Sequence, residues 1–184
     1  FELAARANAR GRFAFPIAVA VGRTDFEIEA KGRGGDTATT DLRVTRGDAA
    51  IAWDVTLLDA IRAGATGPPQ AARALAMVHL AMYDAVNAVT GDHEAYHYDG
   101  TARAGTSETA AAAQAAYRVL VHLYPAQEAT FDAALRESLA TVPGGRARAL
   151  GVRLGNAVGR DMIALRADDG SAAAVDYASG TDPG

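Results

Sequence analysis

The feature that most constrains the fold is the longest helical pattern in the chain, residues 70–89, which read QAARALAMVHLAMYDAVNAV. On a helical wheel, five apolar side chains of this stretch fall on one continuous stripe: Leu75, Val78, Met82, Val86 and Val89. Small Ala residues occupy much of the remaining surface, so few positions need water. A helix that is apolar on most sides is normally covered by neighbours. We therefore expect this helix to lie inside a bundle and to form its centre.

Beside that stripe the same stretch carries a row of hydrogen-bonding side chains, His79, Tyr83 and Asn87, spaced one helical turn apart. Asp84 stands about 140° from His79 on the wheel, so one metal ion cannot bind both from a single helix. We expect His79 to be hydrogen-bonded within the bundle, and we assign no metal to this helix. His122, near the end of another helical pattern, is expected to be a boundary residue.

Four further segments have the helical period: residues 52–63, 107–124, 125–142 and 146–167. In the first of them Val55, Leu58 and Ile61 share a face, which we expect to be the apolar one. Ser107 is a good N-cap for the second, because its hydroxyl can accept a hydrogen bond from the first turn.

The last helical segment carries Gly151, Gly155 and Gly159, one helical turn apart. Each glycine costs a helix interior about 1 kcal/mol relative to alanine. Three on one face therefore predict that another helix packs closely against it.

Residues 1–46 alternate with a period of two instead, which is typical of strands with one buried and one wet face. One predicted strand runs through residues 17–21, a second contains Phe26 and Ile28, and a third contains Leu42 and Val44. Turns are expected at Gly22-Arg23 and over residues 32–36. The period changes near Gly47-Asp48. We therefore predict a mainly α protein, with a small antiparallel β segment over residues 1–47 and a bundle of about five helices over residues 48–184.

The strand region, FAFPIAVAVGRTDFEIEAKGRGGDTATTDLRVTR at residues 13–46, resembles the closing strands of a bacterial immunoglobulin-like repeat. Such a domain needs about seven strands and roughly 100 residues. The resemblance thus implies that only the end of an incomplete sandwich is present. The alternative is a small sheet that belongs to the helical part as its own N-terminal element.

The helical region resembles the N-terminal half of bacterial vanadium-dependent haloperoxidases and of the related type 2 phosphatidic acid phosphatases. The resemblance rests on four segments in the family's order, WDVTLLDAIR at 53–62, AMVHLAMYDAVNAV at 76–89, YRVLVHLYPAQEATFDAAL at 117–135 and ALRADDGS at 164–171. The tail at 177–184 is similar to the stretch that leads on to a Trp-x-Pro segment in the family.

In that family a Lys, two Arg, a Pro-Ser-Gly-His element and a second His hold vanadate or a substrate phosphate in the C-terminal half. Here the only lysine, Lys31, lies in the strand region, and Ser-Gly-His is absent. We therefore assign no catalytic, cofactor-binding or metal-ligating residue. The resemblance implies the scaffold half of an enzyme that oxidises halide with peroxide or hydrolyses a phosphate ester. Its partner would be the C-terminal catalytic half, with vanadate as cofactor. By analogy, the enzyme would be exported, and a homo-oligomer is a further expected partner state. Since the chain starts at Phe1, we expect a piece of a longer protein.

One motif suggests a different chemistry. His93, Glu94 and His97 form a literal H-E-x-x-H, which on a helix places two imidazoles on one face for zinc, with Glu as general base. Glycine-rich flanks leave little room for such a helix, and the only nearby acidic candidates for a third ligand are Glu108 and Glu128. A zinc hydrolase remains an alternative.

Composition excludes other classes of function. The net charge of −4 argues against nucleic acid as a partner, since phosphate binding needs a concentrated basic face. Without cysteine the chain has no disulfide and no thiolate nucleophile. No apolar run approaches the roughly 18 residues of a membrane helix. Besides the two enzyme classes, a non-enzymatic extracellular immunoglobulin-like or adhesion module remains open.

Overall fold

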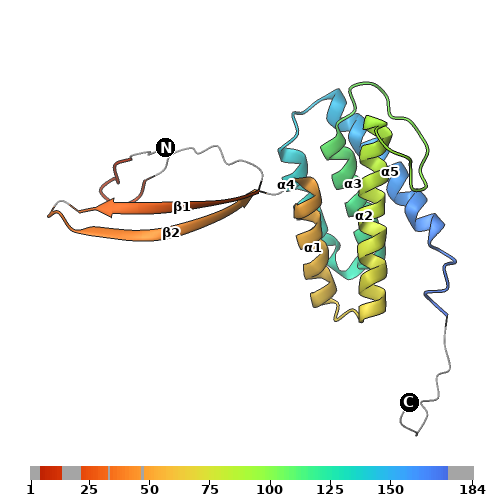
Figure 1. Cartoon of the computed structure of the whole chain (residues 1–184), viewed down its shortest axis with the longest axis horizontal. Coiled ribbons are helices and arrows are strands. Elements are labelled where there is room, and N and C mark those ends of the chain that lie inside the picture. Colours follow the sequence, from red (N-terminus) through yellow and green to blue (C-terminus); the bar gives the residue numbers. More distant parts are fainter. Residues whose placement is uncertain (1–4, 14–21, 33, 47, 174–184) are drawn as a thin grey trace, which may run out of the picture. The chain divides into compact units, whose positions relative to one another are not determined.

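The computed structural model describes residues 5–13, 22–32, 34–46 and 48–173 (Figure 1). Contacts divide the chain into two compact units, residues 1–48 (the hairpin unit) and residues 49–184 (the helical unit). In the described ranges the chain is mainly helical, with five α-helices and a two-stranded antiparallel sheet. This is the predicted fold class. Within the same ranges no helix is both long and apolar enough to span a membrane.

The hairpin unit consists of β1 (Gly22–Lys31) and β2 (Thr37–Arg46), with Phe26 opposite Leu42. The predicted turn over residues 32–36 is confirmed, because the Gly32 amide donates to the Asp36 carbonyl at 2.7 Å and Gly35 adopts a φ of 91°. The turn predicted at residues 22–23 is wrong, since both residues pair with the end of β2. The strand predicted through residues 17–21 lies outside the described residues.

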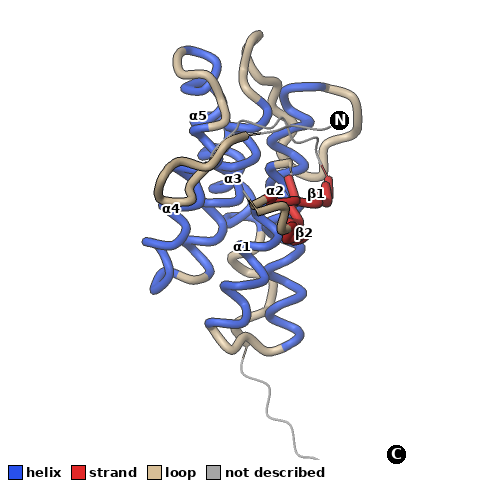
Figure 2. The backbone as a smooth tube through the Cα atoms, turned by 90° about the vertical axis from the view of Figure 1, so that its left-hand side faces the viewer, coloured by secondary structure: helices blue, strands red, loops and turns tan. Residues whose placement is uncertain are grey.

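The helical unit contains α1 (Ala49–Ala63), α2 (Pro68–Thr90), α3 (Glu108–Leu123), α4 (Glu128–Ala140) and α5 (Arg146–Leu165), packed as a bundle (Figure 2). A single 3-10 turn, Pro125–Gln127, precedes α4. Local chemistry sets the ends. Two prolines open α2 and Gly91 closes it in the left-handed conformation. The predicted N-cap is confirmed, because the Ser107 hydroxyl accepts from the Ala110 amide at 3.2 Å.

The centre of the bundle is α3, which contacts all four other helices. Every residue from 110 to 116 is buried. The expectation that residues 70–89 form the centre is therefore wrong, although α2 does contact α1, α3 and α5. Alanine explains the difference, because short side chains let several helices approach α3 closely on all sides.

The buried face of α2 is also turned relative to the predicted stripe. Ala81 and Ala85 are fully buried, whereas Leu75, Val86 and Val89 are only half-buried. Val78 and Met82 of the predicted stripe are buried as expected, and they share the core with these alanines.

The buried face of α1 differs from the prediction in the same way. Trp53, Leu57 and Ala60 are buried, while Val55 is 52% exposed. Burial of the large Trp53 side chain removes more apolar surface from water than burial of Val55, so α1 turns its tryptophan toward the core.

The predicted close contact of the α5 glycines is confirmed, and their partner is α3. A Cβ atom at Gly151 would lie 2.8 Å from Ala110 Cβ, and one at Gly159 would lie 2.7 Å from Arg118 Cβ. The backbones of α3 and α5 thus approach to a distance that no larger residue at these positions permits.

Candidate functional site: the polar row of α2 and the aromatic loop

The residues with the most organised polar chemistry join α2 to the loop that follows it, residues 91–107, here called the aromatic loop. Asp84 projects from α2 and is only 1% exposed. Its carboxylate accepts three backbone N–H groups of the loop, from Tyr96 at 2.7 Å, His97 at 3.0 Å and Tyr98 at 3.0 Å. A buried carboxylate is stable only when its charge is satisfied, and these three donors satisfy it.

Two neighbours of Asp84 extend this attachment. The Asn87 side chain donates to the His93 carbonyl at 2.8 Å and accepts from the His93 amide at 2.9 Å. The Tyr83 hydroxyl donates to the Glu94 carbonyl at 2.6 Å. The aromatic loop therefore folds back along α2. The α2 side chains bind its backbone N–H and C=O groups, so these contacts do not depend on which side chains the loop carries.

The H-E-x-x-H motif lies within the aromatic loop and is not helical. His93 and His97 therefore do not share a helix face in the way that the zinc motif requires. Glu108 and Glu128 begin α3 and α4, respectively. In the part of the chain that the structure describes, no three His, Cys, Asp or Glu side chains converge in a group that could hold a metal ion.

The remaining histidines have separate surroundings. His79 Nε2 lies 3.0 Å from Asp54 Oδ1 on α1, and both side chains are partly exposed. His79 is thus hydrogen-bonded as expected, but at the surface of the bundle. His97 Nε2 lies 3.5 Å from Asp161 Oδ2 on α5. His122 is exposed in the last turn of α3.

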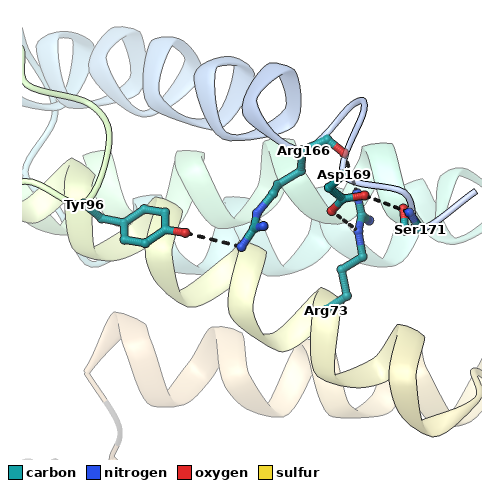
Figure 3. A network of polar contacts seen from close by, with 5 residues as sticks. All are labelled: Arg73, Tyr96, Arg166, Asp169 and Ser171. Atoms are coloured by element: carbon teal, nitrogen blue, oxygen red, sulfur yellow. Dashed lines mark hydrogen bonds and ion pairs between the residues drawn. The ribbon is translucent and has the colours of Figure 1, made fainter.

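A second polar network ties the chain after α5 to α2 and to the aromatic loop (Figure 3). Arg73 donates to Asp169 Oδ2 and to the Arg166 carbonyl, both at 2.8 Å. Arg166 in turn donates to the Tyr96 hydroxyl at 3.3 Å. The hydrogen bond from Arg73, followed by the one from Ser171, holds the pKa of Asp169 well below its usual range.

This network predicts an acid-sensitive attachment. A lowered pKa stabilises the fold above the ordinary carboxyl value of 3.8, and this stabilisation disappears as the pH falls from there through the folded-state pKa. We expect Asp169→Asn to lower the thermal midpoint at pH 6 and to have a smaller effect at pH 2, where part of this stabilisation has been lost. The measurement is thermal unfolding of both proteins across this range.

Asp168→Asn is the matched control for that prediction, since Asp168 is exposed beside Asp169. An equal response of the two variants at pH 6 would contradict the assigned role of Asp169.

That Asp84 anchors the loop is not predicted from the sequence, because the helical wheel places Asp84 away from the row of His79, Tyr83 and Asn87. A signal was present. Asp84 falls on the same helix face as Met77, Ala81 and Ala88, which are all buried. An acidic residue on a face of small side chains indicates a buried acceptor that needs donors.

Five polar side chains of α2 thus bind the aromatic loop, α1 or the chain after α5: Arg73, His79, Tyr83, Asp84 and Asn87. Comparison of the chain with protein-family models, with curated proteins and with solved structures finds no match.

Proposed function

We propose that the helical unit is the scaffold half of a vanadium-dependent haloperoxidase-like enzyme or of a related phosphatase. The observation that carries the proposal is that Tyr83, Asp84 and Asn87 are committed to the aromatic loop. These groups have a structural role, and under this proposal the catalytic groups belong to the C-terminal half.

The positions of the resembling segments support the same proposal. Residues 53–62 lie within α1 and residues 76–89 within α2. Residues 117–135 cross from α3 to α4, and residues 164–171 include the end of α5. Each of these four segments thus falls on an element of the bundle, and none falls on the hairpin unit. The similar tail at 177–184 lies outside the described residues.

The oxyanion chemistry of the proposed enzyme needs guanidinium and ammonium groups for charge and two histidines, one to bind or attack and one as acid or base. The described residues do not fit vanadate, because the four histidines are dispersed and Lys31 belongs to the hairpin unit. Under this proposal a C-terminal catalytic half supplies these groups together with the vanadate site. The enzyme would be exported, and the bundle would offer surface to that half or to a second subunit.

The test compares the 184-residue chain with the protein extended by the sequence that follows Gly184 in its gene. Both are assayed for bromide oxidation with peroxide and vanadate, and for hydrolysis of p-nitrophenyl phosphate. We expect one of these activities in the extended protein and neither in the 184-residue chain. Which one appears decides between haloperoxidase and phosphatase.

An extended protein that contains only further immunoglobulin-like repeats and shows neither activity would contradict the proposal. That outcome would favour the adhesion module.

A further inference from the structure

A second feature of the helical unit is a cavity of about 590 Å³ at the start of α5, here called the arginine cavity. Four arginines line it: Arg103, Arg146, Arg148 and Arg153. Its other lining residues include Leu139, Leu150 and Val152, and neither a histidine nor a lysine is among them. The volume lies in the range of small-molecule sites in proteins.

The four arginines of this cavity differ from other arginines of the chain in their ion pairing. Elsewhere Arg62 and Arg73 each pair with a carboxylate at 2.8 Å. Within the described ranges none of the four cavity arginines lies within 4.0 Å of a carboxylate oxygen. Like charges gathered around one space repel each other, and an anion in that space relieves the repulsion. This concentration of charge stands out in a chain whose net charge is −4.

One of the arginines is held in place by the backbone. The Arg148 guanidinium donates through Nη1 to the Leu139 carbonyl at 3.2 Å. Its Nη2 atom lies 3.1 Å from the position of a Cβ at Gly144. A guanidinium fixed in this way loses less freedom when it binds an anion.

The beginning of α5 adds to the positive electrostatic potential of the arginine cavity. Gly145 provides no side-chain cap, and the first turn contains no acidic residue. The positive end of the helix dipole is therefore uncompensated there, and Arg146 and Arg148 add charge of the same sign. This arrangement destabilises the helix start unless an anion is bound.

A smaller cavity of about 260 Å³ adjoins the arginine cavity and shares Arg103, Leu150 and Arg153 with it. Apolar groups of Tyr98, Leu154 and Ala157 line part of it, together with Ala102 and the two threonines Thr101 and Thr106. The two spaces together thus combine a strongly cationic end with an end that is less charged and partly apolar.

We infer that the arginine cavity binds a small organic oxyanion, a phosphate monoester whose phosphate lies among the arginines and whose apolar group extends toward Tyr98 and Leu154. Bidentate guanidinium groups suit phosphate oxygens. Since neither His nor Lys lines the cavity, this is a binding site without acid–base chemistry. The inference is independent of the proposed function.

The test is calorimetric titration of the 184-residue chain with phenyl phosphate and with inorganic phosphate at low ionic strength. We expect saturable binding of both, with phenyl phosphate the tighter ligand. The double variant Arg146→Gln, Arg153→Gln should bind phenyl phosphate at least about tenfold more weakly, because two charge-assisted contacts are lost. Both positions are exposed, and a thermal midpoint no lower than that of the parent checks that the fold is kept.

Arg160→Gln is the matched control, because Arg160 is exposed on the same helix and does not line the cavity. It should retain the parent affinity within about twofold, since only long-range charge is removed. Absence of saturable binding, or an equal loss in the control and the double variant, would overturn the inference. So would sedimentation of the chain with phosphatidylglycerol vesicles without any response to phenyl phosphate, since a lipid headgroup would then be the ligand.

Discussion

Replacement of Asp84 by alanine is expected to lower the free energy of unfolding by about 3 kcal/mol or more. The carboxylate accepts the amides of Tyr96, His97 and Tyr98. Its removal leaves three N–H groups without their acceptor and opens a cavity beside α2. Urea unfolding followed by the fluorescence of Trp53, the only tryptophan, measures the effect.

The matched control is Asp92→Ala, which removes an exposed acidic side chain from the same loop. We expect it to change stability by less than about 0.5 kcal/mol. Hydrogen exchange gives a local readout, since the amides of residues 96–98 should lose protection in the Asp84 variant before the helices do. An Asp84→Ala protein as stable as the control would refute the anchoring role.

Gly155→Ala is expected to destabilise the bundle by about 2 kcal/mol, although alanine is the better helix former. The added Cβ would lie 2.7 Å from Gln114 Cβ and closer still to the Ala111 carbonyl oxygen. Because the obstruction includes backbone, α3 and α5 must move apart. The same urea titration measures this change.

The reverse substitution at an exposed site of α5, Ala157→Gly, measures helix propensity alone and should cost about 1 kcal/mol. If propensity alone governed position 155, Gly155→Ala would stabilise the protein by a similar amount. A stabilised Gly155→Ala variant would therefore contradict the close approach of α3 and α5.

The helices of this fold are predictable from the sequence because their ends carry strong local signals. Pro68 and Gly91 mark the ends of α2, and Ser107 marks the start of α3. The α5 glycines also predict a close helix contact correctly. The identity of the central helix is not predictable in this way. Periodicity identifies a buried face from the spacing of large apolar side chains. In α3 the buried run is mostly alanine, so small side chains occupy every face and no such spacing appears.

The contacts between Asp84 and the aromatic loop are hard to predict from the sequence for a different reason. Asp84 binds backbone amides, which every residue except proline possesses, so the side chains at residues 96–98 carry no trace of the contact. The H-E-x-x-H spacing is visible in the sequence, but this spacing does not determine the backbone conformation of residues 93–97. In the structure Asp84 and Asn87 hold that backbone in a non-helical loop, where the His97 imidazole lies 3.5 Å from Asp161.

We propose that the helical unit is a scaffold without a catalytic site of its own. The most direct test of this proposal is the assay of the purified 184-residue chain for vanadate-dependent bromide oxidation and for p-nitrophenyl phosphate hydrolysis. The scaffold account predicts no turnover above the protein-free control. Vanadate-dependent turnover that disappears in His79→Ala or His97→Ala would contradict it.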